Sequence, residues 1–257
     1  MGSLAALIDQ LEPEVEDPEE ETFLLYSQPI PSLDLGFIDP RAASVDVSVA
    51  GHDFTIHQSP AVLSSSRAGG TTGAARLRYL PLSALALAPR VARYVLTDQS
   101  YVQRLLQRNI DENLGVRSGL LRHVYANWEP SINFTTLDWE TDEVTPSLTG
   151  SGEVRSFDAV VACDCVYNYA LVSPFVQTCV DACRLRSVDD AFTGDDSRPC
   201  ICVIGQQLRN DEVFESWLET FHASFRVWRV PDDALPEDLR SSAGFVVHIG
   251  VLREEMR

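Results

Sequence analysis

The sequence predicts an α/β fold built on an open, mainly parallel sheet. Segments rich in β-branched and small apolar residues alternate with segments whose apolar residues recur at helical spacing, as in βαβ units. Two of the strand-like segments, residues 158–163 and 200–205, are nearly continuous apolar runs, which is typical of parallel strands buried on both faces.

The composition is that of one ordinary globular domain with a flexible extension, since 45% of the 257 residues are hydrophobic and 23% are charged. The net charge is -18, and all 20 Lys and Arg positions are arginine. Phosphate contacts need clustered cations, so direct nucleic-acid binding is disfavoured and a basic protein is the natural partner. No apolar stretch reaches the roughly 18 residues that cross a bilayer. We therefore expect no membrane span, a cytoplasmic location and reduced cysteines.

Residues 1–36 predict an acidic, flexible arm. Glu and Asp dominate residues 11–21, and no cation occurs before Arg41. Repulsion between like charges should keep this arm extended or weakly structured. We interpret it as a solvated tail, with docking onto a basic partner as the alternative.

Residues 37–73 predict a β-hairpin followed by a loop. β-branched and aromatic residues at 44–50 and 54–57 flank Gly51-His52-Asp53, which suits a short turn. Residues 64–73 are mostly small, which predicts the loop. Residues 74–257 are then expected to form the main domain.

The main domain begins its alternation with two short strands. Residues 93–97 are apolar and end at Asp98, and residues 132–137 end at Asp138-Trp139. Between these strands, apolar residues at helical spacing predict a helix, at Val102, Leu105, Leu106 and Ile110.

The C-terminal half continues this pattern. Residues 158–163 stop at Asp164, and a helical stripe follows at Val172, Phe175, Val176, Cys179 and Cys183. A polar loop is predicted for residues 187–198, before the run at 200–205. Asn210 predicts the cap of another helix, whose apolar face is Val213, Phe214, Trp217, Leu218 and Phe221. Two final strands, 225–230 and 245–252, are expected to pair antiparallel.

Polar side chains follow the predicted strands at Asp98, Asp138, Asp164 and Gln206-Gln207. In open parallel sheets, ligands bind beyond the carboxyl ends of the strands. A carboxylate there can accept hydrogen bonds from both hydroxyls of a ribose. Asp98 is therefore a candidate ribose ligand, with capping of the next helix as the alternative.

Short motifs at these strand ends resemble the seven-strand protein lysine methyltransferases, and in particular the fungal ribosomal lysine N-methyltransferase 5 group. The similar motifs are Thr97-Asp98 before a helix with Asn109-Ile110, Leu137-Asp138-Trp139, and the segment from Ala162 through Asp164 and Tyr167 to Asn168. Upstream, Gln58-Ser59-Pro60 and the glycine-rich residues 69–73 also resemble this group. The likeness runs from about Phe37 to the end, and Asp164-x-x-Tyr167 is its most specific part.

The resemblance implies a Rossmann-like seven-strand methyltransferase sheet and S-adenosyl-L-methionine as the methyl donor. Asp98 would hold the ribose hydroxyls, and Asp138 or its neighbouring backbone would contact the adenine amine. Trp139 would line the adenine pocket, and Cys163 would face the cofactor. Core packing is the alternative for Trp139.

The resemblance also implies that Asp164 and Tyr167 line the catalytic face where a lysine amine arrives. Methyl transfer is an in-line displacement, so the enzyme mainly supplies position and a polar environment. The lysine must be neutral to attack, which a desolvated pocket favours. For Tyr167, the alternative is an aromatic residue at the edge of the core.

One part of the family pattern is missing. The first strand should end in an acidic residue and a glycine-rich loop that lets the backbone approach the donor. Here only seven residues separate Gly73 from Pro81, where residues 81–88 resemble the family's first helix. A strand with its helix takes roughly 30 residues within a βαβ unit. The first strand is thus expected to be missing or degenerate, so either another segment replaces it or the chain is a shortened version of an active relative.

Cysteines provide a rival interpretation that we do not favour. Cys163-x-Cys165 and Cys200-x-Cys202 could hold zinc as neighbours, but this spacing is tighter than usual zinc ligands have. No His-x-Glu motif supports a zinc deaminase. No metal ligands are therefore predicted.

Together, these features predict a monomeric S-adenosylmethionine-dependent protein-lysine N-methyltransferase that acts on a basic protein of the large ribosomal subunit. The alternative is a catalytically inactive methyltransferase-like domain used for protein interaction, because the glycine-rich loop is missing.

Overall fold

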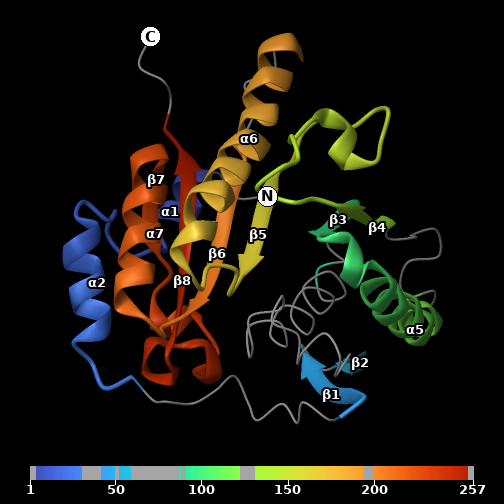
Figure 1. Cartoon of the computed structure of the whole chain (residues 1–257), viewed down its shortest axis with the longest axis horizontal. Coiled ribbons are helices and arrows are strands. Elements are labelled where there is room, and N and C mark those ends of the chain that lie inside the picture. Colours follow the sequence, from blue (N-terminus) through green and yellow to red (C-terminus); the bar gives the residue numbers. More distant parts are fainter. Residues whose placement is uncertain are drawn as a thin grey trace. The chain divides into compact units, whose positions relative to one another are not determined.

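The computed structural model (Figure 1) describes residues 4–30, 42–49, 52–58, 87, 91–121, 131–193 and 199–253. The chain divides into two units, each described here by itself. The C-terminal unit combines Met1–Leu33 with Trp139–Arg257, and the central unit is Asp34–Asp138. The N-terminal segment is thus grouped with the C-terminal strands, unlike in the sequence-based division into 1–36, 37–73 and 74–257.

The C-terminal unit is built on a four-stranded mixed sheet in the order β5-β6-β8-β7 (Figure 1). As their apolar runs predict, β5 (Ala159–Cys163) and β6 (Ile201–Gln207) pair in parallel. β8 (Phe245–Leu252) pairs antiparallel with β6 and with β7 (Phe225–Arg229), which confirms the predicted closing pair. The carboxyl ends of β5 and β6 therefore lie at the same edge of the sheet.

Two helices of this unit, α6 (Tyr169–Thr193) and α7 (Asp211–Ser224), pack against each other and contribute to the core. The predicted loop at 187–198 begins too early, since α6 continues to Thr193. The predicted cap of α7 is confirmed, because the Asn210 side-chain oxygen accepts the Val213 N–H at 2.8 Å.

β8 passes so close to α7 that one position requires glycine. A Cβ atom at Gly250 would overlap Cζ of Phe221. The Phe221 ring is itself held by stacking on Phe225, with 4.2 Å between ring centroids. Close packing of helix against strand thus depends on the absence of a side chain at Gly250.

The acidic N-terminal segment is packed onto the sheet instead of extending as a flexible arm. It contains α1 (Leu4–Ile8) and α2 (Pro18–Tyr26). Between these helices, the Val15 N–H donates to the Val227 carbonyl at 2.8 Å, so the segment covers the edge of β7. Val15 and Leu25 are buried in the core. Burial of these side chains and new backbone hydrogen bonds outweigh the repulsion that favours an extended arm.

One acidic residue of α2 is buried with basic partners. Oε1 of Glu21 lies 3.2 Å from Nε2 of His248, which is fully buried, and 3.4 Å from Arg229. Burial alone would raise the pKa of Glu21, but the hydrogen bond and charge of His248, together with Arg229, outweigh it and lower that pKa. The charge of this glutamate therefore helps to fasten α2 to the sheet.

The central unit contains two pairs of strands and a long helix. β1 (Ser44–Val49) pairs antiparallel with β2 (His52–His57), and β3 (Arg93–Asp98) pairs in parallel with β4 (Ser131–Thr136). α5 (Gln103–Leu121) follows β3 after a 3₁₀ turn, η2 (Ser100–Val102). The helix includes three of the predicted apolar positions, Leu105, Leu106 and Ile110, and extends well beyond them, whereas the fourth, Val102, is the last residue of η2. Val102, Leu106 and Ile110 are buried.

Side-chain amides of α5 pair with the backbone of β2. Oδ1 of Asn113 accepts the Thr55 N–H at 3.0 Å, and its Nδ2 donates to the Thr55 carbonyl at 3.0 Å. Asn113 therefore satisfies both backbone groups of one residue at the strand edge, much as a neighbouring strand would.

The other regular elements are short 3₁₀ turns: η3 (Pro146–Thr149), η4 (Asp232–Ala234), η5 (Glu237–Leu239) and η6 (Ser241–Ala243). Within the described ranges, no helix combines the length and hydrophobicity needed to span a membrane. The predicted loop at 64–73 and the segment 81–88, apart from residue 87, lie outside the described residues. The described strands form sheets of four, two and two strands, so the structure is a mixed α/β protein.

Candidate active site

In the central unit, two predicted site residues lie at neighbouring strand ends. Asp98 ends β3, and Asp138 lies two residues beyond the end of β4. Gln99 connects them, because its N–H donates to Oδ1 of Asp98 at 2.7 Å and its Nε2 donates to Oδ2 of Asp138 at 3.5 Å. Parallel pairing thus brings the two carboxylates to one edge, and Gln99 is a contact residue that the sequence analysis missed.

Asp98 does not occupy the cap position that was its alternative interpretation. The N-cap of the following 3₁₀ turn is Gln99, and Asp98 is still the last residue of β3. Asp98 is only 5% exposed, and its backbone carbonyl accepts the Leu137 N–H at 3.0 Å. A buried carboxylate needs polar partners, and ligands of parallel sheets bind beyond the strand ends. The position of Asp98 is therefore suited to binding a polar ligand.

Trp139 belongs to the C-terminal unit and packs against α6. Its ring centroid lies 5.0 Å from that of Phe175, and the ring is partly buried against the core. Trp139 therefore makes the core-packing contact that was its alternative interpretation. Its role in an adenine pocket stays a prediction.

Asp164 has an unusual backbone conformation at the end of β5. Its φ of 49° is the one positive φ of a non-glycine residue among the described residues. The Asp164 N–H donates to the Gly205 carbonyl at 2.7 Å, which extends the β5–β6 ladder. A residue other than glycine in the left-handed region is uncommon, and such residues cluster at functional sites.

The side chain of Asp164 forms an ion pair that the sequence analysis did not identify. Oδ2 of Asp164 lies 2.7 Å from a terminal nitrogen of Arg209, whose Nε donates to Oε1 of Gln207 at 2.7 Å. Arg209 follows the end of the neighbouring parallel strand, and that position was the available signal. The ends of β5 and β6 thus form a charged network around Asp164.

Cys163 and Tyr167 flank this network in sequence. Burial, and then the charge of Asp164, raise the pKa of the Cys163 thiol to about 11. A thiol with this pKa is neutral near pH 7, so Cys163 suits a wall of the site better than a nucleophile. Tyr167 is partly buried in the segment between β5 and α6, and its predicted role stays a prediction.

The remaining cysteines pack in the core. Sγ of Cys183, in α6, lies 3.6 Å from Sγ of Cys202, in β6, and both residues are buried. In the part of the chain that the structure describes, no group of three or more His, Cys, Asp or Glu side chains could hold a metal ion.

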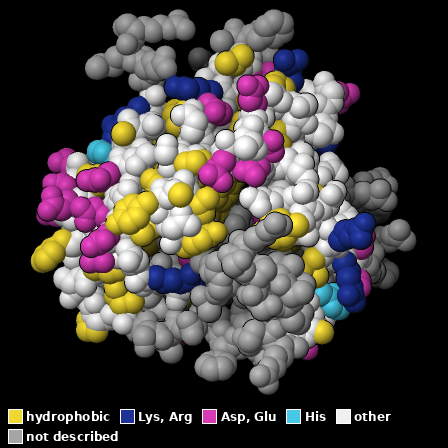
Figure 2. Space-filling model, in the orientation of Figure 1, with side chains coloured by type: hydrophobic (Ala, Val, Ile, Leu, Met, Phe, Trp, Pro, Cys, Tyr) yellow, Lys and Arg dark blue, Asp and Glu magenta, His cyan; other side chains and the backbone are white. Residues whose placement is uncertain are grey.

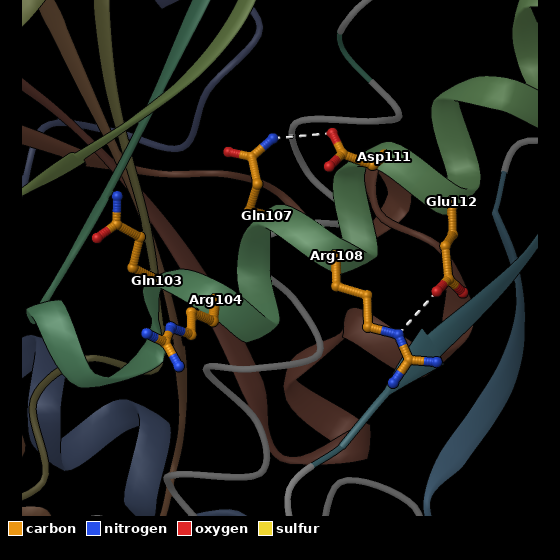
Figure 3. Close-up of a pocket in the computed structure, with 6 residues that line it drawn as sticks. All are labelled: Gln103, Arg104, Gln107, Arg108, Asp111 and Glu112. Atoms are coloured by element: carbon orange, nitrogen blue, oxygen red, sulfur yellow. Dashed lines mark hydrogen bonds and ion pairs between the residues drawn. The ribbon is translucent and has the colours of Figure 1, made fainter.

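A surface hollow on the central unit lies along α5 (Figure 3). Its polar side chains all come from this helix: Gln103, Arg104, Gln107, Arg108, Asp111 and Glu112. Gln107 donates to Asp111 at 2.8 Å and Arg108 to Glu112 at 2.7 Å, as expected for a solvated helix face. The hollow contains none of the predicted site residues.

The chain matches a known family over the segment that contains the predicted site residues. Residues 82–198 match the family model described as lysine methyltransferase. This range includes Asp98, Asp138, Trp139, Cys163, Asp164 and Tyr167.

The chain is similar to two curated fungal proteins, both named ribosomal lysine N-methyltransferase 5. The protein of Zygosaccharomyces rouxii is 28% identical over 178 residues, which cover 62% of this chain and 52% of that protein. The protein of Lachancea thermotolerans is 28% identical over 159 residues, which cover 56% of this chain and 44% of that protein. The chain spans about half the length of these relatives. Together with the family match, they confirm the resemblance predicted from the sequence.

Proposed function

We propose that this protein is an S-adenosylmethionine-dependent protein-lysine N-methyltransferase that acts, as a monomer in the cytoplasm, on a basic protein of the large ribosomal subunit. The observation that carries the proposal is Asp164, which is held in a left-handed conformation at the end of a parallel strand, within the segment matched by the lysine methyltransferase family. The names of the two fungal relatives support the choice of a ribosomal substrate.

The residues at the ends of β3 and β4 fit the adenosine part of the donor. Asp98 offers a nearly buried carboxylate for the ribose hydroxyls, and Asp138 lies beyond the neighbouring strand. For the methionine part, the sequence lacks the acidic residue and glycine-rich loop that should end the first strand. We therefore assign donor binding mainly to the adenosine end.

The charged network at β5 and β6 suits the arrival of a lysine amine. When bound, S-adenosylmethionine supplies a methyl group on a positively charged sulfur. A neutral lysine nitrogen would accept this methyl group, and the surplus proton on nitrogen would go to water. Asp164 and Tyr167 would orient the amine, and Cys163 would limit access of water beside it.

The parallel pairing of β3 with β4, and of β5 with β6, supports within each unit the Rossmann-like seven-strand fold that the resemblance implies. The residues between Gly73 and Pro81, where the sequence leaves too little room for a first strand, lie outside the described residues.

Calorimetric titration with S-adenosylmethionine tests donor binding. We expect micromolar affinity, about -8 kcal/mol, and loss of this affinity in Asp98→Ala. Asp46→Ala removes an exposed carboxylate from the same unit and should leave the affinity unchanged. A folded wild-type chain that binds no donor would contradict the proposal.

Transfer is tested with radiolabelled donor and large-subunit proteins from fungi. The chain contains no lysine, so any labelled lysine must belong to the added proteins. Label on lysine that disappears with Asp164→Ala supports the proposal. Donor binding without lysine labelling in any of these proteins would contradict the proposed substrate.

A non-catalytic interaction domain is the second candidate function, and the acidic surface of α2 and α7 favours it. Figure 2 shows acidic side chains gathered on the side of the molecule where Figure 1 places α2. Burial, and then the charges of neighbours that include Glu219 and Glu19, raise the pKa of Glu215, so these carboxylates repel one another. A basic partner would relieve this repulsion.

This second candidate predicts binding that does not need the methyl-transfer residues. A pull-down of basic ribosomal proteins should survive Asp164→Ala and fail when Glu19, Glu20 and Glu215 are all changed to Gln. Equal capture by this triple variant and the wild type would contradict the interaction role.

A further inference from the structure

Arg209 connects the ends of β5 and β6 through its guanidinium group. One terminal nitrogen lies 2.7 Å from Oδ2 of Asp164, and Nε donates to Gln207 at 2.7 Å. Arg209 also precedes Asn210, the residue that caps α7. Asp164 and Gln207 thus hold the guanidinium group of Arg209. The backbone of Arg209 is fixed in addition, because the next residue begins α7.

Asp164 needs such a partner because its side chain is only 9% exposed. A buried carboxylate without a compensating cation is costly, and it would attract any positive charge that reaches it. The backbone of Asp164 is fixed by its hydrogen bond to Gly205, so the carboxylate has little freedom to turn to solvent.

We propose that Arg209 is a positioning residue that neutralises Asp164, so that an incoming lysine is not held there as a cation. This inference rests on the proposed function. A carboxylate without Arg209 would favour the ammonium form of the lysine, whose nitrogen has no lone pair for attack. A carboxylate that is already paired with arginine stabilises the ammonium form less. The neutral lysine amine can therefore lie beside Asp164.

The proposal predicts that removal of the arginine charge strengthens binding of a simple ammonium ion. The probe is n-butylammonium, which carries the lysine head group, and binding is followed by NMR shifts of the Asp164 and Gly205 amides. We expect Arg209→Gln to bind the probe about tenfold more tightly than wild type. Arg209→Lys keeps the charge and should stay close to wild type.

Two variants separate this effect from a general change in charge. Arg226→Gln removes an arginine of the same unit that pairs with Glu14 at 2.6 Å, and it should leave probe binding unchanged. The double variant Arg209→Gln with Asp164→Asn should lose the gain in affinity. If Arg209→Gln does not fold, Arg209→Met, which keeps an apolar stem, provides the same comparison.

Equal probe affinity in wild type and Arg209→Gln would overturn the proposal, as would a gain that persists in the double variant. Donor binding is measured on the same samples by calorimetry. Failure of the wild type to bind S-adenosylmethionine would contradict the proposed function, whereas the comparison with n-butylammonium would still decide the role of Arg209.

Discussion

Asn109 forms a reciprocal pair of hydrogen bonds with the backbone of His57. Its Oδ1 accepts the His57 N–H at 2.7 Å, and its Nδ2 donates to the His57 carbonyl at 3.1 Å. Asn113 forms the same pair with Thr55, so two amides one helical turn apart match two alternate residues of the strand. In this way α5 occupies the place that a neighbouring strand would take beside β2.

We predict that Asn109→Ala lowers the free energy of unfolding by about 2–4 kcal/mol, because it leaves two backbone groups of β2 without a partner. Asn109 is fully buried, so water cannot readily replace the amide. Urea unfolding measures the change, and Gln107→Ala, an exposed position on the same helix, is the control. A loss no larger than that of the control would contradict this role.

The ion pair of Glu21 predicts a stability that depends on pH. Its pKa lies below the ordinary 4.5, so the unfolded chain binds more protons than the folded chain as the pH falls through this range. The contribution of Glu21 is therefore complete above pH 4.5 and is lost as the pH falls through the lower, folded pKa.

We expect Glu21→Gln to lower the free energy of unfolding by about 1–2 kcal/mol near pH 7. The difference from wild type should shrink as the pH falls below 4.5, because wild-type Glu21 then loses its charge as well. Urea unfolding across this range measures the difference, with Glu20→Gln as an exposed control on α2. A difference that is constant with pH would show that the charge of Glu21 is not involved.

Local pattern was enough to predict the features that depend on neighbouring residues. The apolar runs predict the parallel pairing of β5 with β6, and Asn210 predicts the start of α7. The positions of Asp98 and Asp164 at strand ends also follow from the sequence, because each comes directly after an apolar run. The same reasoning was wrong for Gln206 and Gln207, which are still part of β6.

Features that depend on residues far apart in the chain could not be predicted in this way. The ion pair of Asp164 with Arg209 spans 45 residues. The hydrogen bond of Val15 to Val227 connects the N-terminal segment to a strand of the C-terminal part of the chain. The charge of the N-terminal segment suggested an extended arm because the local pattern does not reveal the sheet edge that it covers. The backbone of Asp164 is likewise set by its tertiary contacts.

The contact between Gly250 and Phe221 predicts a large effect from a small substitution. In Gly250→Ala the added methyl would overlap the Phe221 ring, and we expect a loss of about 1–3 kcal/mol in the free energy of unfolding. Gly152→Ala is the matched control, because nothing lies within 4 Å of the added atom. The double variant Gly250→Ala with Phe221→Leu should lose less than the sum of the two single changes. Additive losses would show that the two positions do not compete for space.

The raised pKa of Cys163 predicts its reactivity. Thiolate is the form that reacts with iodoacetamide, and a pKa of about 11 leaves little thiolate near neutral pH. The labelling rate of Cys163, followed by mass spectrometry of its peptide, should therefore keep rising up to about pH 11. Asp164→Asn removes the nearby negative charge and should move this rise to lower pH, whereas Asp181→Asn, a change at a half-buried position on α6, should not. A rate that levels off near pH 9, the ordinary pKa of a thiol, would contradict the burial of Cys163 beside a carboxylate.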